Sequence, residues 1–366
     1  MIRSVSDPAA FRAQFPVVGD RVYMNAGTEG PVPRAAAQAV TERVERDTAH
    51  GRVGRAYFDE ALDLAARCRT AYADLLGADR VDVALTGSTT DGINTVLGGL
   101  SLSEGDEILT TDQEHPGLLG PLRLARVRHG VRIRVVAFDD VAREIGPGTR
   151  LVACSHVSWV NGSIVDVAGL RESGVPFLLD AAQGIGAVPV DVAEIGCDFY
   201  AASGQKWLCG PEGSGCLFVR RDRLDDLEPP WPSFGTLADH DDPLGSGLAE
   251  TAKRLDHGFP PTIRSVWALA SMGVFADAGW EWVHDRAATL AHRLATALAE
   301  RGLEVAPRGR STLVSWHADD PAAEVERLGA HDVVIRSIPS GNLLRASVGA
   351  WNSEDEIMRL AELAAP

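Results

Sequence analysis

The chain has little basic charge and no long apolar run. Lysine and arginine together number 35 in 366 residues, against 51 aspartates and glutamates, which gives a formal charge of −16. Phosphate contacts need clustered basic side chains, so this acidic excess argues against nucleic acid and against an anionic membrane surface. No apolar run reaches the roughly 18 residues of a membrane span. We therefore expect neither nucleic acid nor a membrane as a partner.

Cysteine is also scarce, and its spacing excludes two further classes of protein. An odd number of cysteines without a CxxC pair argues against a disulfide framework and against a structural zinc site. The five are Cys68, Cys154, Cys197, Cys209 and Cys216. Residues 1–8 contain no apolar segment of the signal-peptide type. Reduced thiols in the cytoplasm are the simplest interpretation, and no metal site is expected.

What is present is an ordinary globular composition, 45% hydrophobic and 23% charged, with alternating helical and strand-like segments. Short apolar runs bounded by glycine, proline or polar residues are typical of strands buried on both faces of a mostly parallel sheet. Such runs lie at 81–85, 107–111, 131–136, 151–156, 176–179, 199–202 and 216–219. Helical patterns lie at 35–49, 62–76, 90–100 and 118–128. This order predicts an α/β fold, which binds ligands beyond the carboxyl ends of its strands.

The second half of the chain changes in style. Segment 228–247 is rich in proline, glycine and aspartate, and we expect it to be a long loop that shapes the binding pocket. Two helices, 263–278 and 280–300, follow. Beyond them we expect strands at 303–306, 312–316, 333–338 and 343–348, with helices at 321–328 and from a capping box at 353–356. The predicted organisation is an N-terminal arm (1–20), a large domain (21–262), connecting helices (263–300) and a small α+β C-terminal domain (301–366) that includes the arm.

Two unusual charges lie near the ends of neighbouring apolar runs. Asp180 closes one run, and Lys206 follows a Ser-Gly-Gln turn after the next. A carboxylate in such a place needs a cation, while partial desolvation lowers the pKa of a lysine amine and makes it a nucleophile. Pyridoxal 5′-phosphate meets both needs, because the lysine forms a Schiff base and the carboxylate pairs with the protonated pyridine nitrogen. The alternative, a turn-capping aspartate and a surface lysine, is favoured for each residue alone but not for the pair.

Three further features fit this chemistry, and each has a structural alternative. The hydroxyl-rich segment 85–92 lies between a strand and a helix, and it suits either a phosphate or a plain N-cap. His115 follows a strand, where an imidazole stacks on a planar ring and moves a proton, or is simply a polar loop residue. Arg345 lies within an apolar strand and needs an anion, which is either a substrate carboxylate or an internal acidic side chain.

Several motifs in a consistent order resemble the class V, fold-type I, PLP-dependent enzymes: cysteine desulfurases, selenocysteine lyases, isopenicillin N epimerase-like proteins and cystine C–S lyase. The motifs are QFP at 14–16, YMNAG at 23–27, TTDGIN at 89–94, EHPG at 114–117, SHVSW at 155–159, DAAQ at 180–183, SGQKW at 203–207 and RASVGAW at 345–351. The resemblance covers nearly the whole chain. It implies a large domain with a mostly parallel seven-stranded sheet, a small α+β C-terminal domain and a homodimer.

The resemblance also implies roles around the cofactor. Lys206 matches the Schiff-base lysine, Asp180 the aspartate at the pyridine nitrogen and His115 the histidine stacked on the ring, and these three are the predicted catalytic residues. Gln183 matches the glutamine at the ring hydroxyl. The predicted phosphate-binding residues are Thr89, Thr90, Ser203 and Gln205, the last standing where many desulfurases have histidine.

Substrate and partner contacts follow from the same resemblance. Arg345 matches the arginine that holds the substrate α-carboxylate, and Asn25 and Trp159 are the other predicted substrate-binding residues. Segment 253–262 corresponds to one that reaches the active site of the partner subunit. Phe259 stands where many relatives have a phosphate-binding threonine, and Thr262 is the other candidate for that contact.

One departure decides the predicted reaction. Desulfurases carry a catalytic cysteine shortly before the carboxylate-binding arginine, whereas residues 337–342 contain none. Within the family the chain is most similar to cystine C–S lyase, including a related segment at 336–338. This similarity predicts α,β-elimination from cystine or another S-substituted cysteine to pyruvate, ammonia and a thiol or persulfide. An aminotransferase, an amino-acid epimerase and a non-catalytic binding protein stay open as alternatives.

Overall fold

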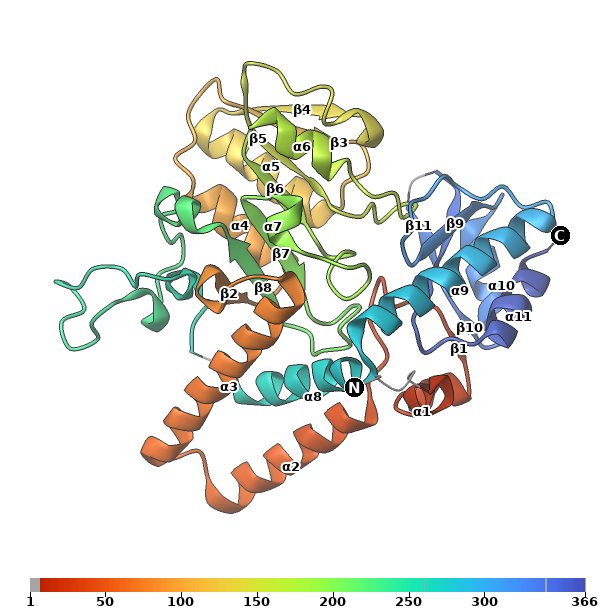
Figure 1. Ribbon diagram of the computed structural model, residues 1–366, viewed down its shortest axis with the longest axis horizontal. Helices are drawn as coiled ribbons and strands as arrows, with labels where there is room; N and C mark the ends of the chain where they lie inside the picture. The colour runs from red at the N-terminus through yellow and green to blue at the C-terminus, as the bar shows by residue number, and fades with distance from the viewer. Residues whose placement is uncertain (1–6, 260, 340, 366) are drawn as a thin grey trace.

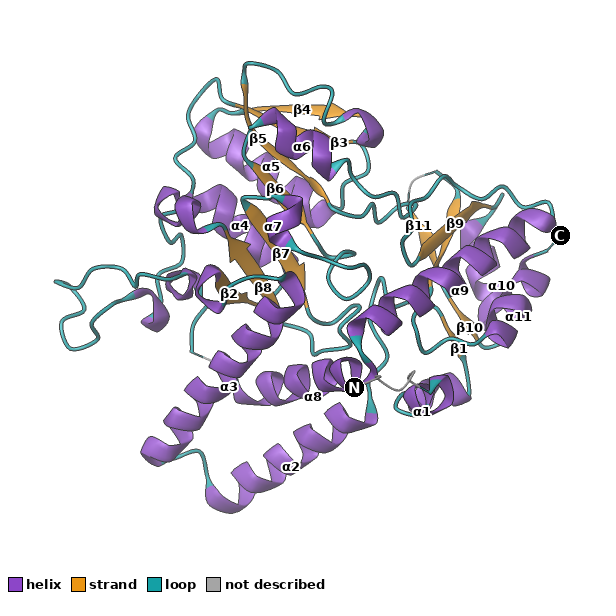
Figure 2. Ribbon diagram, viewed as in Figure 1, coloured by secondary structure: helices purple, strands orange, loops and turns teal. Residues whose placement is uncertain are grey.

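A seven-stranded sheet forms the centre of the large domain (Figures 1 and 2). The computed structural model describes residues 7–259, 261–339 and 341–365. The first six residues of the predicted arm, position 260 of the predicted partner-reaching segment and position 340 of the cysteine-free interval lie outside the described residues. The strands are β2 (Val83–Thr86), β3 (Glu107–Thr111), β4 (Arg132–Val136), β5 (Thr149–Ser155), β6 (Phe177–Asp180), β7 (Phe199–Ser203) and β8 (Gly215–Val219).

The strand order of this sheet is β2-β8-β7-β6-β5-β3-β4, and only β8 runs antiparallel to its neighbours. The predicted mostly parallel α/β sheet is therefore confirmed. The strand ends differ slightly, chiefly because residues 80–82 form a 3₁₀ turn (η2, Arg80–Asp82) before β2. From β3 the chain steps outward to β4 and then crosses back to β5 on the other side of β3. Such a reversal opens a crevice at the carboxyl ends of the strands.

Helices cover both faces of the sheet, because its strands are apolar on both sides. In β5, Leu151 and Ala153 pack into one core, while Val152 and Cys154 pack into the other. Helices α4 (Thr89–Gly99) and α5 (Pro116–His129) contribute to the first core. The second core includes residues of α3 (Gly54–Leu76), α6 (Val167–Ser173), α7 (Val192–Ile195) and α8 (Thr262–Ala278). Burial on both faces explains why the strands are continuous apolar runs in the sequence.

Two parts of the chain project from the large domain (Figure 1). Helices α2 (Arg34–His50) and α3 form a long hairpin beside α8. The described residues between β8 and α8 form only 3₁₀ turns, η4 (Arg221–Asp226), η5 (Phe234–Thr236) and η6 (Ala252–Leu255), and the central loop extends outward. Among the described residues, no helix is both long enough and apolar enough to cross a bilayer.

The small domain combines both ends of the chain. Its three-stranded antiparallel sheet has the order β11-β12-β9, formed by β9 (Leu313–His317), β11 (Arg336–Ile338) and β12 (Leu343–Ser347). A separate parallel pair joins β1 (Val22–Tyr23) to β10 (Val333–Val334), so the N-terminal segment adds a strand here. Helices α9 (Trp280–Glu300), α10 (Pro321–Gly329) and α11 (Glu354–Ala364) complete the domain.

Two strand predictions in this domain are wrong in detail. The predicted strand 303–306 is only an isolated bridge between Val305 and Trp316. Pro307 follows it at once, and because proline has no N–H to donate, the ladder stops there. The predicted strand 333–338 is two strands, β10 and β11, which pair with different partners.

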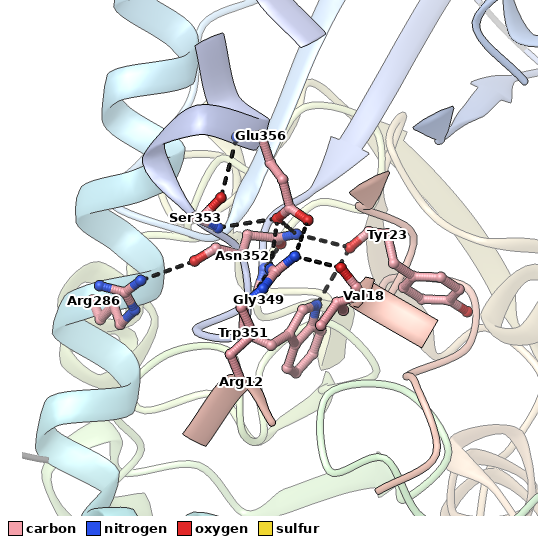
Figure 3. Close-up of polar contacts among 9 residues, drawn as sticks. All are labelled: Arg12, Val18, Tyr23, Arg286, Gly349, Trp351, Asn352, Ser353 and Glu356. Atoms are coloured by element: carbon pink, nitrogen blue, oxygen red, sulfur yellow. Dashed lines mark hydrogen bonds and ion pairs between the residues drawn. The ribbon is translucent and has the colours of Figure 1, made fainter. Parts of the chain in front are cut away.

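A buried polar cluster, here called the Arg12–Glu356 cluster, fastens the N-terminal arm to α11 (Figure 3). The guanidinium of Arg12 in α1 (Pro8–Arg12) donates to both carboxylate oxygens of Glu356, at 2.6 and 3.0 Å. The amide of Asn352 donates to Glu356 at 2.9 Å and to the Tyr23 carbonyl at 3.1 Å. Ser353 caps α11 within the predicted capping box. The cluster thus holds together segments from the two ends of the chain.

Candidate active site

A cavity of about 230 Å³ lies at the carboxyl edge of the large sheet, where the small domain faces it. Its walls come from the ends of β3, β6 and β7, the amino end of α4, the loop after β5, the segment after β1, and β11. The lining residues are Gly27, Thr28, Glu29, Ser88, Thr89, Thr90, His115, Trp159, Asp180, Ala182, Gln183, Ser203, Gln205, Lys206 and Arg336. Most predicted site residues therefore meet at one place, the crevice that the strand order provides.

Asp180 and Lys206 face each other across two neighbouring strands. Asp180 ends β6 and pairs with Ala201 of β7, and Lys206 follows the turn after β7. Burial raises the pKa of the Asp180 carboxyl, while the Ala182 N–H at 3.0 Å and the charge of Lys206 oppose that shift. Burial lowers the pKa of the Lys206 amine to about 8, against the pull of Asp180. A buried carboxylate that accepts a single hydrogen bond, here from Ala182, is suited to pair with a bound cation.

The opposite end of the cavity is built for an anion. Ser88 caps α4 by accepting from the Asp91 N–H at 3.1 Å. The amino end of α4 lines the cavity, and the N–H groups at such a helix end attract anions. Three buried polar atoms here have no hydrogen-bond partner among the described residues: Thr89 Oγ1, Ser203 Oγ and Gln205 Oε1. Buried hydroxyls are almost always hydrogen-bonded, so Thr89 Oγ1 and Ser203 Oγ are suited to donate to an anion such as phosphate, whereas Gln205 Oε1 can only accept.

His115 closes one side of the cavity and is neutral. Its Nδ1 accepts the Gly117 N–H at 3.0 Å, which leaves the proton on Nε2, and its ring meets Trp159 edge-on at 4.9 Å. Burial lowers the pKa of His115 to about 4, and the cations Lys206, Arg336 and Arg345 add to that shift. The loop-histidine alternative does not describe this position, because the imidazole lines the cavity.

Arg345 is fully buried just behind the cavity wall. It donates from Nη1 to the Trp159 carbonyl at 2.6 Å, while its Nε and Nη2 have no partner, and no acidic side chain pairs with it among the described residues. A Cβ atom on Gly27 would lie 2.8 Å from Nη2, so the guanidinium packs closely against Gly27, which lines the cavity. Arg336 is its cross-strand neighbour, and burial lowers the pKa of both guanidinium groups.

Arg336 and Glu29 line the cavity although residue-by-residue reasoning gave them no role. Arg336 donates to Thr28 Oγ1 at 3.2 Å and lies over the Trp159 ring at 5.8 Å. The Glu29 carboxylate is half-buried without a hydrogen bond or ion pair among the described residues, and burial raises its pKa.

Two predicted contacts are arranged differently from expectation. Gln183 donates to the Gly27 carbonyl and accepts from Trp207 Nε1, each at 2.8 Å, so its amide is held by the protein. Asn25 accepts from Thr28 at 2.9 Å and does not line the cavity, which gives it an indirect place in the site.

The 253–262 segment and the long loop lie away from the cavity of their own chain. Thr262 begins α8 with its hydroxyl 3.5 Å from that of Tyr57, and Phe259 is exposed against Phe58. No described residue of loop 228–247 lines the cavity, so the expectation that it shapes this pocket is wrong within one chain. The loop extends outward instead (Figure 1).

The model of one protein family, aminotransferase class-V, matches residues 22–360. The chain belongs to this family. It is 29% identical to isopenicillin N epimerase of Streptomyces clavuligerus, with 93% of each chain covered. It is 31% identical to cysteine desulfurase CsdA of Escherichia coli, with 97% of this chain and 96% of the other covered. Among solved structures, the cystine C–S lyase C-DES in complex with cysteine persulfide matches with a TM-score of 0.90 and 28% identity, covering 96% of this chain and 99% of that one.

Members of the aminotransferase class-V family depend on pyridoxal 5′-phosphate, and this chain is an enzyme of that kind. The cavity fits the cofactor on its own evidence. Asp180 would offer a buried carboxylate to the pyridinium, Lys206 a buried amine to the aldehyde, and the partnerless hydroxyls at α4 and β7 would offer donors to the phosphate.

Proposed function

We propose that this member of the aminotransferase class-V family is a carbon–sulfur lyase. It cleaves the β C–S bond of cystine, or of another S-substituted cysteine, by α,β-elimination. The observation that carries the proposal is that no cysteine lines the cavity, although the amine, carboxylate and guanidinium groups for amino-acid chemistry are all at hand. Elimination needs no protein thiol, whereas the desulfurase reaction does.

The thiols of the chain are unsuited to accept sulfur. All five cysteines are buried and unpaired, and burial raises the pKa of each thiol. Since the thiolate is the nucleophile, such groups are inert at neutral pH. The hairpin between β11 and β12, where a desulfurase cysteine would stand, is short and contains none.

Two arginines favour a substrate with carboxylate groups. Arg336 and Arg345 are directly opposite each other on β11 and β12, and neither has an acidic partner among the described residues. Like charges in such a cross-strand pair are unfavourable unless an anion lies between or beside them. We assign Arg345 to the α-carboxylate and Arg336 to an anionic group farther along the substrate, such as the second carboxylate of cystine.

Side chains of the protein perform the proton transfers. When bound, pyridoxal 5′-phosphate supplies a carbonyl carbon that joins the substrate amine and a ring that stabilises negative charge at Cα. Lys206 Nζ removes the Cα proton, and its lowered pKa of about 8 leaves a useful fraction neutral near neutral pH. Asp180 would pair with the protonated pyridine nitrogen of the bound cofactor. Arg345 would hold the substrate carboxylate.

The sulfur then leaves with the electron pair of the Cβ–S bond. From cystine this gives a persulfide, which is a stable anion and needs no full proton transfer. His115, with a pKa of about 4, is neutral at working pH and is better suited to donate an Nε2 hydrogen bond than a proton. The three-carbon enamine takes up water and yields pyruvate and ammonia.

The test is a product assay with several amino acids. We expect the cofactor-loaded protein to release pyruvate and ammonia in equal amounts from L-cystine, without an added keto acid. Iodoacetamide should leave the rate unchanged, because the thiols are buried. Alanine formed from L-cysteine, together with inactivation by iodoacetamide, would point to a desulfurase instead. A wild-type protein that acquires no visible absorption with the cofactor would indicate a binding protein.

Amino-acid epimerisation is the second candidate, favoured by the similarity to isopenicillin N epimerase. It uses the same proton removal at Cα and returns the proton to the other face. Loss of optical rotation, with Cα–H exchange in deuterated water and no pyruvate, would identify it. A requirement for a keto acid acceptor would identify an aminotransferase.

We also propose that two copies associate, with segment 253–262 of each near the cavity of the other. Its support is an exposed apolar surface at Phe58, Phe259 and Ile263, next to that segment. Sedimentation should give twice the chain mass for wild type and less for Phe259→Asp. A cytoplasmic location is proposed on the five cysteines that form no disulfide.

A further inference from the structure

The crevice that contains the cavity opens where β3 and β5 stop pairing, near their carboxyl ends. Their ladder pairs Ile108 with Leu151 and Leu109 with Val152, and no later pair is formed although both strands continue. Beyond that point the ladder has no further pair between the two strands. Something else must fix their separation, because the site residues on either side belong to different strands.

Glu114 spans this gap. Its carboxylate accepts from the backbone N–H of Ser155, at 3.0 and 3.1 Å, and from the Ser155 hydroxyl at 2.6 Å. On the β3 side it accepts from the Thr111 hydroxyl at 2.5 Å. The carboxylate therefore links the two strands where their ladder has ended. It is 5% exposed and makes no ion pair among the described residues, so it is not held there by a cation.

The Glu114 carboxylate is connected to residues on both sides of the cofactor crevice. Glu114 directly precedes His115 in the chain. Ser155 pairs with Asp180 in the β5–β6 ladder, and the next residue, His156, donates its backbone N–H to the Asp180 carbonyl at 2.9 Å. A change at Glu114 thus alters the spacing between His115 and Asp180, which lie on opposite sides of the reversal in strand order.

We propose that Glu114 is a positioning residue that ties the ends of β3 and β5 across the crevice and so sets the spacing of His115 and Asp180 around the cofactor. The inference rests on cofactor binding, as the proposed function does. The role of Glu114 is indirect, because its carboxylate does not line the cavity.

The chain offers a matched control at the other end of the same strand. Glu107 is also a buried carboxylate that bridges from β3 to β5, accepting from the Thr149 hydroxyl at 3.0 Å, and it accepts from Arg134 at 3.1 Å. It lies at the amino edge of the sheet, away from every cavity-lining residue on the carboxyl edge. A general loss of sheet stability should follow from either substitution, whereas a change at the cofactor should follow from only one.

The experiment compares Glu114→Gln with Glu107→Gln in the full chain. Cofactor affinity and the visible circular dichroism of the bound cofactor are measured beside thermal unfolding. We expect Glu114→Gln to weaken cofactor binding by about tenfold or more and to change the dichroism, because one amide cannot accept from all three donors. Glu107→Gln should leave affinity within about twofold, a difference below 0.5 kcal/mol. Ser155→Ala, which removes only one of the donors, should act in the same direction as Glu114→Gln but less.

Equal losses of affinity in both glutamine variants would overturn the inference, since they would mean a general effect on the sheet. Wild-type affinity and dichroism in Glu114→Gln would overturn it too. If Glu114→Gln does not fold, Ser155→Ala decides, and unchanged dichroism in that variant counts against the proposal. These results are distinct from failure of the proposed function, in which wild type itself would bind the cofactor but release no pyruvate.

Discussion

Two groups of buried polar side chains in this molecule differ in how far their hydrogen bonds are satisfied. In the Arg12–Glu356 cluster, no buried side-chain nitrogen or oxygen lacks a partner among the described residues (Figure 3). In and behind the cavity, Thr89, Ser203, Gln205 and Arg345 all have buried polar atoms without one. A buried polar group without a partner destabilises the fold. The first group therefore contributes to stability, whereas the second is arranged for a ligand.

The difference is a guide to which substitutions affect stability and which affect function. Removing a member of the satisfied cluster leaves its former partners buried and unpaired. Removing one of the partnerless cavity hydroxyls, Thr89 Oγ1 or Ser203 Oγ, leaves no such partner behind in the free protein. Substitutions in the two places should thus separate stability from cofactor binding, and the following predictions test that separation.

The largest effect is expected at Lys206. The chain contains only two lysines, Lys206 and Lys253, which makes the second a matched control. Lys206→Ala should lower turnover by at least about a thousandfold, because it removes the general base as well as the covalent attachment of the cofactor. The unfolding free energy of the cofactor-free protein should stay the same or rise, since a desolvated amine is lost.

Lys253→Ala should keep the covalent attachment of the cofactor, because Lys253 does not line the cavity of its own chain. Borohydride reduction followed by peptide mapping should place the cofactor on Lys206 alone. Labelling of Lys253, or full activity in Lys206→Ala, would contradict the assignment of the cavity as the catalytic centre.

An intermediate effect, on stability alone, is expected at Glu356. Glu356→Gln breaks the ion pair with Arg12 and should lower the free energy of unfolding by about 2 kcal/mol, measured by urea denaturation. Cofactor affinity should not change. Glu354→Gln, on the same helix, removes an exposed ion pair with Arg293 and should cost less than about 0.5 kcal/mol. A large loss of cofactor affinity in Glu356→Gln would erase the distinction between the two groups.

Much of this arrangement could be predicted from sequence, for physical reasons. Asp180 and Lys206 follow two apolar runs, and because carboxyl ends of neighbouring parallel strands share one edge, their meeting was predictable. Ser353 carries its N-cap signal in the local sequence, and the structure has that cap. The burial of both sheet faces is likewise visible as unbroken apolar runs.

Other features depend on contacts that no local pattern reports. The pairing of β1 with β10 joins segments from opposite ends of the chain. Arg336 lines the cavity from β11, which is separated from β10 at Ile335, a break that the single predicted strand 333–338 did not contain. Gly27 covers Arg345, and that close approach depends on how the N-terminal segment lies over β12.

The smallest effect is expected at His156, which lies beside the site but has no buried side-chain atom without a hydrogen-bond partner. Its Nδ1 bonds the Tyr200 hydroxyl at 2.9 Å, and burial lowers its pKa to about 4. In the unfolded chain a histidine binds its proton near pH 6.5, so the folded state loses stability as pH falls from there toward 4. The raised pKa of Glu114, about 7, acts in the opposite direction, which makes a comparison of variants necessary.

His156→Gln should therefore flatten the dependence of unfolding free energy on pH. Relative to the variant, wild type should lose about 1 kcal/mol between roughly pH 6.5 and pH 5.5, because the unfolded histidine alone takes up a proton in that window. The exposed His50, replaced by glutamine, serves as the control and should not change the slope. Cofactor affinity at neutral pH should match wild type in both variants, since neither histidine lines the cavity. A parallel pH profile in His156→Gln would show that this histidine titrates in the folded protein as it does in the unfolded chain.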